Sequence, residues 1–176
     1  TILVLHLGIE DYETTREIAA QLKETTDKLE MPFIFKASFD KANRTSVDAF
    51  RGPGLTEGLS VLEEIKKEFG MSILSDVHRI RDIPAAARIL DIIQIPAFLC
   101  RQTDVIVAVA KSGRVINIKK GQFVSPLDFR QAVNKVLSTG NNNILLTERG
   151  TFFGYNNLVV DFRGIPIMKA FGFPVV

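Results

Sequence analysis

The chain has 176 residues, of which 46% are hydrophobic and 24% are charged, and its formal net charge is +2. This composition is typical of a globular domain with a sizeable core, and the small net charge gives no sign of a nucleic-acid partner. No apolar run approaches the roughly 18 residues of a membrane span. The single cysteine, Cys100, excludes an intrachain disulfide and fits a reducing, cytoplasmic compartment. The first ten residues lack a basic leader and a cleavage site, so they predict a strand and not a signal peptide.

Short apolar runs alternate with longer amphipathic segments along the chain. The apolar runs predict strands at residues 2–5, 33–35, 72–75, 91–95, 115–118, 143–146 and 173–176. The helical spacing of apolar residues between them predicts helices at 12–29, 55–69, 82–88, 101–111 and 125–137, with a shorter helical segment within 157–171. Gly70 is expected to end the second helix, while Asp82 and Ser125 are expected to cap the third and the fifth.

Strands that alternate with helices predict an α/β fold of parallel βαβ units, in which helices cover the sheet. More than five consecutive units favour a (β/α)8 TIM barrel over a doubly wound sheet. We therefore predict a single barrel domain over residues 1–176 with only about the first seven strands present. The sequence contains neither GxGxxG nor GxxxxGK[ST], so a nucleotide-binding loop lacks support.

Polar residues follow the carboxyl ends of the predicted strands, and in a barrel these ends converge on one mouth. They are Lys36, Asp76 with His78, Gln94, Lys119 with Gln122, and Arg149. The richest stretch is KASFDKANRTS, residues 36–46, whose cations and short hydrogen-bonding side chains suit phosphate and carboxylate groups. A solvated basic loop after a strand has a similar composition. Because a mouth with so many cations repels itself when empty, we expect two anionic substrates or one that carries both phosphate and carboxylate.

Seven stretches resemble, in order and spacing, the family of 3-deoxy-D-manno-octulosonate 8-phosphate (KDO8P) synthases: KASFDKANRTS, FRGPG, SDVH, IIQIPAFLCRQTD, INIKKGQF, TERGTFFGYNNLVVD and GFPVV. This family belongs to a superfamily of phosphoenolpyruvate-dependent aldol-type synthases. The sister DAHP synthases carry a KPRTS-type stretch at the first of these positions, so the KANR element is specific. The resemblance implies a cytoplasmic transferase of KDO and lipopolysaccharide precursor biosynthesis. It also implies a homo-oligomer, a tetramer, without nucleic-acid or membrane partners.

The resemblance also implies ligands for two substrates. Phosphoenolpyruvate is expected to be bound by Lys36, Ser38, Gln94, Pro96, Ala97, Lys119 and Arg149. D-Arabinose 5-phosphate is expected to be bound by Lys41, Asn43, Arg44, Thr45, Asp76, Phe98 and Gln122. Arg101 is similar to an arginine that reaches the sugar phosphate in a neighbouring subunit's site.

The implied catalytic residues are Lys41, Lys119, Arg149 and Asp76. In the implied reaction, the enol C3 of phosphoenolpyruvate attacks the sugar aldehyde, water adds at C2, and phosphate leaves by C–O cleavage. Lys119 and Arg149 are expected to stabilise negative charge on phosphoenolpyruvate, and Lys41 is expected to interact with the aldehyde oxygen.

Two stretches depart from the family pattern. The family's first strand carries an Asn or a Cys that separates metal-independent from metal-dependent enzymes, and gapless alignment puts Leu7 at that position. Leu7 cannot bind a metal, and a lone His6 is weak evidence for an alternative ligand. A divalent metal occurs in the family, but no ligands for it are assigned here. The family also continues beyond Val176 with its catalytic His, the remaining metal-site acids and an eighth βα unit, so we expect a truncated, poorly stable barrel.

Three hypotheses stay open at this point. The KDO8P synthase leads, and a DAHP-type or sialic-acid-type synthase is the alternative among enzymes. An inactive remnant that binds phosphoenolpyruvate or sugar phosphate is the alternative from a different class, because both ends of the chain depart from the family pattern. For the same reason, the chain as written is expected not to turn over substrate by itself.

Overall fold

The computed structural model describes residues 3–176, except for the side chain of His6. Contacts between Cα atoms divide the chain into two compact units. The first comprises the residues up to Asp76 together with Pro84–Ile92, and the second comprises Val77–Ile83 and Ile93–Val176. The predicted single domain is not tested by this division and stays a prediction.

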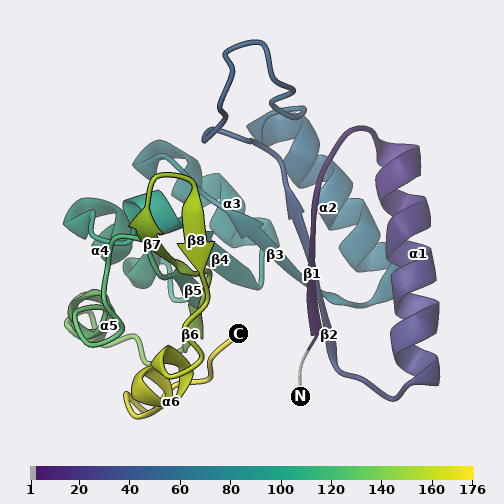
Figure 1. The fold of residues 1–176 in the computed structure, drawn as a ribbon. Coiled ribbons are helices and arrows are strands. Elements are labelled where there is room, and N and C mark those ends of the chain that lie inside the picture. Colours follow the sequence, from purple (N-terminus) through teal and green to yellow (C-terminus); the bar gives the residue numbers. More distant parts are fainter. Residues whose placement is uncertain (1–2) are drawn as a thin grey trace. The chain divides into compact units, whose positions relative to one another are not determined.

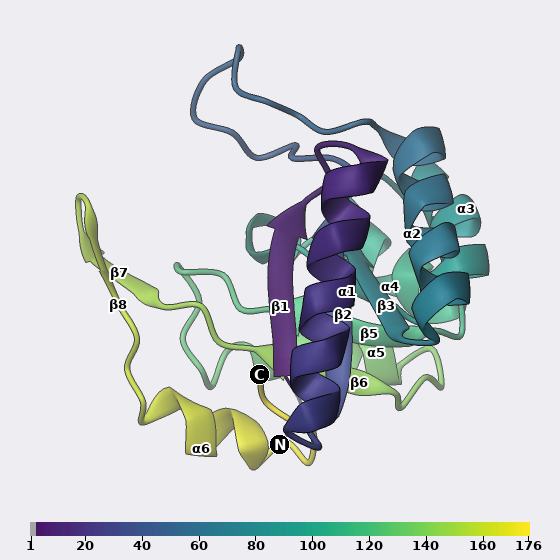
Figure 2. The same ribbon diagram turned by 90° about the vertical axis from the view of Figure 1, so that its right-hand side faces the viewer.

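The first unit contains three parallel strands in sequence order, with helices between them. Its elements are β1 (Leu3–Gly8), α1 (Tyr12–Lys28), β2 (Phe33–Ser38), α2 (Leu55–Phe69), β3 (Ser72–Asp76) and nearly all of α3 (Ile83–Ile89). Leu3 lies opposite Phe33, and Ile34 lies opposite Ser72. Helix α1 runs alongside β1 and β2 (Figures 1 and 2) and packs against β2 and α2.

Local signals in the sequence explain where the helices of this unit begin and end. The Asp11 carboxylate accepts a hydrogen bond of 2.7 Å from the Thr14 backbone N–H, which caps α1 and lowers the pKa of Asp11. Helix α2 ends at Gly70, as predicted, because Gly70 adopts a left-handed φ of 63°. Phe35 and Ile73 on the strands and Leu62 on α2 are completely buried and form part of the core.

The second unit repeats the pattern and ends with a hairpin. Its elements are η1 (Ile80–Asp82), β4 (Ile92–Ile95, from Ile93 onward), η2 (Ala97–Leu99), α4 (Thr103–Lys111), β5 (Val115–Lys119), α5 (Arg130–Leu137), β6 (Ile144–Thr147), β7 (Thr151–Gly154), β8 (Asn157–Val159) and α6 (Gly164–Lys169). The strand order is β4-β5-β6, with β5 and β6 parallel, and α4 packs against α5. Strands β7 and β8 pair antiparallel in a separate two-stranded sheet.

The predicted fold class is confirmed, because parallel strands follow one another in sequence order with helices between them, as in part of a (β/α) barrel. The last predicted strand is present only as a short pairing. Val175 forms a parallel bridge to Leu146, and the Val176 N–H donates to the Leu146 carbonyl over 2.7 Å. The chain therefore reaches a seventh strand position beside β6.

Three local predictions were wrong in part. The helical segment predicted within residues 157–171 is present only as α6, while residues 157–159 form strand β8, since Thr151, Phe152 and Phe153 favour strand and Asn156 turns the chain with a φ of 56°. Asp82 does not cap α3, because its buried carboxylate accepts a hydrogen bond of 2.8 Å from Arg79. Ser125 does accept from the Asp128 N–H over 3.1 Å, but it caps a turn, and α5 begins only at Arg130.

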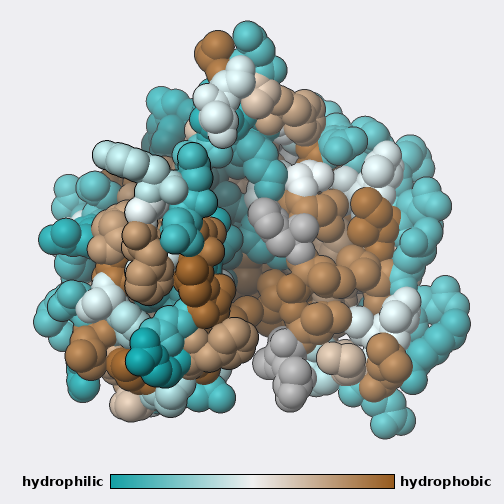
Figure 3. All heavy atoms as spheres, viewed as in Figure 1, coloured by the Kyte–Doolittle hydropathy of each residue, from teal (hydrophilic) through white to brown (hydrophobic). Residues whose placement is uncertain are grey.

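Two apolar surfaces stand out. Apolar side chains gather over β1 in the first unit (Figure 3), where Leu3, Leu5 and Leu7 are half-buried. In the second unit, the β7–β8 hairpin exposes Phe152 and Phe153. Within residues 3–176, no helix combines the length and the apolar composition that crossing a membrane requires.

Candidate functional site

In the first unit, the carboxyl ends of β2 and β3 bring three predicted site residues together. The Lys36 Nζ lies 3.1 Å from the Ser38 hydroxyl and 3.1 Å from the Asp76 carboxylate, and the Ser38 hydroxyl donates to the same carboxylate oxygen. Lys36, Ser38 and Asp76 are 3%, 1% and 8% exposed, so a lysine and a carboxylate share a nearly dry site. An ion pair at such burial persists only with good geometry and further hydrogen bonds, and Ser38 supplies one.

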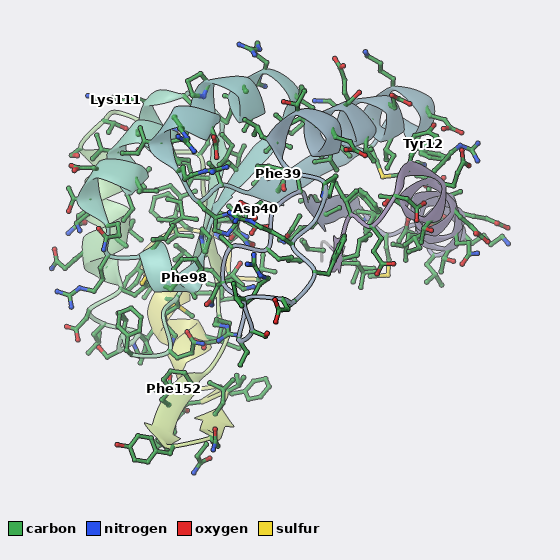
Figure 4. The ribbon with its side chains drawn as sticks, turned by 90° about the horizontal axis from the view of Figure 1, so that it is seen from above. Tyr12, Phe39, Asp40, Phe98, Lys111 and Phe152 are labelled. Carbon is green, nitrogen blue, oxygen red and sulfur yellow. The ribbon has the colours of Figure 1, made fainter. Side chains whose placement is uncertain are left out.

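The loop that follows β2 is tied at its base. The Lys41 N–H donates to the Arg51 carbonyl over 2.7 Å, and the Arg51 guanidinium binds the Asp40 carboxylate with contacts of 2.8 and 3.2 Å. Gly52 has a φ of 101°, and a Cβ there would lie 2.7 Å from the Phe39 carbonyl oxygen, so only glycine fits the turn. Phe39 and Asp40 mark this base in Figure 4. The stem therefore holds Lys41 in place while the rest of the loop reaches into solvent.

Lys41 lies across the end of β1. Its Nζ is 3.5 Å from the Leu7 carbonyl oxygen, and a Cβ on Gly8 would come within 2.9 Å of the Lys41 Cε. The Arg44 Nη1 donates to the Lys41 carbonyl over 3.0 Å, whereas Asn43 and Thr45 are exposed. The structure thus packs Lys41 against the stretch where the first strand departs from the family pattern, and it leaves Asn43 and Thr45 open to solvent.

Burial lowers the pKa of Lys41 below its ordinary value, and the nearby charge of Asp76 opposes this only in part. If Lys41 binds an anionic ligand, as the resemblance implies for D-arabinose 5-phosphate, affinity for that ligand should fall as the pH rises through this lowered pKa, because the neutral amine loses its attraction. The Lys41→Arg variant stays charged and should keep its affinity over the same range. Calorimetric titrations from neutral pH towards about pH 10, near the ordinary lysine pKa, measure this. If the affinity fell equally in the unmodified protein and in Lys41→Arg, the pH dependence would belong to another group.

In the second unit, polar side chains line one face of β4, β5 and β6. The Asn117 Nδ2 donates to the Gln94 Oε1 over 3.1 Å, and the Thr147 hydroxyl donates to the Asn117 Oδ1 over 2.7 Å. Lys119 is half-buried, two residues beyond Asn117, and lies opposite Thr147 in the register. Because side chains two apart on a strand share a face, Lys119 belongs to the same polar face as Gln94 and Asn117.

A buried lysine joins the loops that follow β5 and β6. The Lys120 Nζ donates to the Gly150 carbonyl over 3.1 Å and to the Thr151 hydroxyl over 3.2 Å, and it lies 3.5 Å from the Glu148 carboxylate. The same Glu148 oxygen accepts from the backbone N–H groups of Arg149 and Gly150, over 2.9 and 2.6 Å. Lys119 and Arg149, both predicted ligands, thus sit directly beside the two ends of a buried ion pair.

The remaining predicted residues of this unit differ in burial. Pro96 and Ala97 are buried, and Gln122 is half-buried. Phe98 is 40% exposed, and its ring stacks on that of His78 with centroids 5.9 Å apart. The Arg101 side chain is exposed and borders a cavity of about 310 Å³, which is also lined by Cys100, Phe123, Val124, Asp128, Phe129, Gln131, Ala132 and Lys135.

The described side chains do not fit a metal site. Among them, no group of three or more His, Cys, Asp or Glu residues is arranged to hold an ion. Leu7 is half-buried and apolar, and the His6 side chain, proposed as an alternative ligand, lies outside the described residues. Cys100 is buried, and this burial raises the pKa of its thiol, so it is protonated near neutral pH.

Three polar residues with clear structural contacts were missed as site residues by the sequence analysis, namely Asp40, Asn117 and Lys120. Each is at most 4% exposed. Asn117 did carry a signal, because an asparagine inside the apolar run Ile116–Ile118 must find hydrogen-bond partners once the strand is buried. The identity of those partners, which lie on other strands, is not written in the local sequence.

Comparisons with known proteins agree with this arrangement. The model of the family described as DAHP synthetase I matches residues 7–176. A 2-dehydro-3-deoxyphosphooctonate aldolase from Trichlorobacter lovleyi is 56% identical over 178 residues, which cover 99% of this chain and 65% of that protein. A protein of the same name from Desulfosudis oleivorans is 62% identical over 161 residues, or 92% of this chain and 58% of that protein. The chain thus spans less than two thirds of the length of the curated relatives it matches.

Proposed function

We propose that this chain, which belongs to the DAHP synthetase I family, acts as a KDO8P synthase. The reaction condenses phosphoenolpyruvate with D-arabinose 5-phosphate and water, and it yields 3-deoxy-D-manno-octulosonate 8-phosphate and phosphate. Relatives 55–62% identical that bear the name 2-dehydro-3-deoxyphosphooctonate aldolase support this choice within the family. The observation that carries the proposal is the buried cluster of Lys36, Ser38 and Asp76. It is followed in the sequence by the loop that contains Lys41–Arg44, whose base is held by hydrogen bonds to Arg51.

Phosphoenolpyruvate carries a phosphate and a carboxylate, so it needs several cations and neutral donors. We assign it to the set of residues that the family resemblance implies, namely Lys36, Ser38, Gln94, Pro96, Ala97, Lys119 and Arg149. Buried or half-buried donors suit this ligand, because a desolvated cation attracts an anion more strongly than a solvated one. Lys36 and Gln94 are both less than 5% exposed, which supports the assignment.

D-Arabinose 5-phosphate is assigned to a second set of residues. These are the residues that the family resemblance implies, namely Lys41, Asn43, Arg44, Thr45, Asp76, Phe98 and Gln122. The exposed Asn43 and Thr45 lie on the loop tied by Asp40 and Arg51, which supports a role in capturing a polar, phosphorylated sugar from solvent.

The proposed chemistry forms a C–C bond between C3 of phosphoenolpyruvate and the aldehyde carbon of the sugar. Water adds at C2, and the bond from C2 to the phosphate oxygen breaks, so phosphate leaves with both electrons of that bond. In this proposal Lys119 and Arg149 stabilise negative charge on the carboxylate and the phosphate, and Lys41 donates to the oxygen that develops charge at the aldehyde. Asp76 positions Lys36 and binds the sugar.

We also propose a cytoplasmic homotetramer, in which Arg101 reaches the sugar phosphate bound by a neighbouring subunit. The exposed Arg101 and the exposed aromatic side chains of the β7–β8 hairpin support an interface in the second unit. Sedimentation of the complete protein measures its oligomeric state.

Phosphate release separates the candidate functions. The complete protein should release phosphate from phosphoenolpyruvate with D-arabinose 5-phosphate, and much more slowly with erythrose 4-phosphate or a mannosamine derivative. A preference for erythrose 4-phosphate would favour a DAHP-type synthase, and a preference for the mannosamine derivative a sialic-acid-type synthase. Calorimetric binding of both ligands without any phosphate release would favour the inactive binding remnant.

The Arg44→Ala variant should bind D-arabinose 5-phosphate more weakly, and its affinity for phosphoenolpyruvate should change less. A guanidinium can bind a phosphate through two charge-assisted hydrogen bonds, and losing them costs about 2 kcal/mol, or roughly 30-fold in affinity. Calorimetry with each ligand separately measures the difference. The matched control is Arg88→Ala, which removes an exposed arginine of the same unit and should change neither affinity. Equal losses for both ligands in Arg44→Ala would contradict the assignment of Arg44.

A further inference from the structure

A row of three polar side chains crosses β4, β5 and β6 in the second unit. Gln94 and Asn117 are only 4% and 2% exposed, and Thr147 at the end of β6 is half-buried. The row holds together through two side-chain hydrogen bonds, of 3.1 Å between Gln94 and Asn117 and of 2.7 Å between Asn117 and Thr147. Polar side chains at such burial require partners, and these three residues provide them for one another.

The two hydrogen bonds of the row run in the same direction, from Thr147 through Asn117 to Gln94. The Thr147 hydroxyl donates its hydrogen to the Asn117 Oδ1, which turns the amino group of Asn117 towards Gln94. Gln94 then accepts with its Oε1, so its own amino group, Nε2, points to the other end of the row. Within the part of the chain that the structure describes, the row therefore ends in an N–H donor and not in a carbonyl oxygen.

A donor at this end suits an anion, and an acceptor does not. The Oε1 and Nε2 of a free glutamine exchange places by rotating the terminal amide, at little energetic difference. An anionic ligand gains a hydrogen bond from one orientation and is repelled by the other. Lys119, on the same face two residues beyond Asn117, indicates that anionic groups are the ligands of this face. A preset neutral donor there attracts an anion without adding to the repulsion among cations.

We infer that Asn117 is a positioning residue, which together with Thr147 holds the Gln94 amide so that its Nε2 faces the phosphate or carboxylate of phosphoenolpyruvate. This inference rests on the proposed function, because it takes that substrate as the ligand of Gln94. Asn117 does not touch the substrate. It acts by removing the amide orientation that would repel it, so the binding site is organised before the ligand arrives.

The Asn117→Asp variant tests the direction of the row. Its carboxylate can only accept, so it takes hydrogen bonds from the Thr147 hydroxyl and from the Gln94 Nε2, and it turns the Gln94 Oε1 towards the ligand. Calorimetry on the complete protein above neutral pH should show phosphoenolpyruvate binding weakened by roughly 10- to 100-fold. Binding should recover as the pH falls and the introduced carboxyl group protonates, because a protonated carboxyl group donates again. Affinity for D-arabinose 5-phosphate should change far less.

Two controls separate orientation from simple charge repulsion. Asn143→Asp adds the same charge at an exposed site of the same unit and should leave binding unchanged. In a Gln94→Met background, Asn117→Asp should cause little further weakening, because there is no amide left to turn. Charge repulsion alone would instead weaken binding equally in both backgrounds, and this outcome would overturn the inference.

A second variant serves if Asn117→Asp does not fold. Thr147→Val removes the hydroxyl that donates to the Asn117 Oδ1. It should therefore weaken phosphoenolpyruvate binding several-fold, and binding should not recover at low pH. Unchanged affinity in this variant would overturn the inference. If the unmodified protein fails to bind phosphoenolpyruvate, the proposed function falls and this inference with it. If it binds and Asn117→Asp binds equally well at every pH, only the inference falls.

Discussion

Replacing Lys120 with methionine should destabilise the protein by about 3–5 kcal/mol, the cost typical of removing one partner from a buried ion pair. The Lys120 side chain is 1% exposed and its partner Glu148 is 7% exposed. The substitution keeps the apolar stem but leaves the Glu148 carboxylate and the Gly150 carbonyl without their cation. Denaturation by urea, with the free energy of unfolding extrapolated to water, measures the effect.

The exposed Lys111 at the end of α4 provides the matched control for this substitution. Lys111→Met makes the same chemical change on the surface of the same unit and should alter stability by less than about 0.5 kcal/mol. In a double-mutant cycle with Glu148→Gln, the two losses should not add, because the second substitution removes the charge that the first left unpaired. A loss below about 1 kcal/mol for Lys120→Met would mean that solvent or a shifted loop replaces its contacts.

Much of the fold could be predicted because buried parallel strands have a strong local signature. Runs such as Ile73–Leu74 and Ile92–Ile93 are apolar on both faces, and helices of ordinary amphipathic pattern separate them. Strand ends were harder to predict. β2 continues through Lys36 to Ser38, since a lysine inside a sheet can bury its long stem and pair its charge, as Lys36 does with Asp76.

The β7–β8 hairpin could not be predicted by the same reasoning. The expected alternation of strand and helix suggested only a helical segment within residues 157–171, so the strand propensity of Thr151–Phe153 and the turn at Asn156 were given too little weight. In this part of the chain the local signal was correct and the global pattern was misleading. Helix α6 forms only from Gly164, after the hairpin has ended.

The contacts of the candidate site were predictable where they depend on the order of the strands, and not where they depend on the conformation of a loop. Lys36, Ser38 and Asp76 come together because the carboxyl ends of neighbouring parallel strands lie side by side. Lys120 contacts Glu148 and Gly150 in the turn that follows β6, and the conformation of this turn, in which Gly150 has a φ of 91°, is not specified by the pattern of apolar runs.

Replacing Lys36 with methionine should reduce both phosphoenolpyruvate binding and stability, and the two effects can be separated. Lys36 is buried, with its Nζ 3.1 Å from Asp76 and 3.1 Å from Ser38. Lys36→Met leaves the Asp76 carboxylate beside an apolar side chain, which should cost about 3 kcal/mol of stability. If Lys36 also binds phosphoenolpyruvate, its loss should weaken affinity by roughly 30- to 100-fold, the equivalent of one strong charge-assisted contact.

The double variant Lys36→Met with Asp76→Asn distinguishes the structural role from the binding role. Removing both charges together should restore most of the lost stability, since the buried carboxylate that lost its contact with Lys36 is then neutral as well. Phosphoenolpyruvate binding should stay weak, because the neutral pair cannot replace the ammonium group that attracts the ligand. Urea denaturation and calorimetry on the same samples measure the two quantities, with the exposed Lys28→Met as the control that should change neither. If the double variant regained affinity along with stability, the role of Lys36 would be structural, and its charge would not contribute to phosphoenolpyruvate binding. The other cations would then have to bind this ligand.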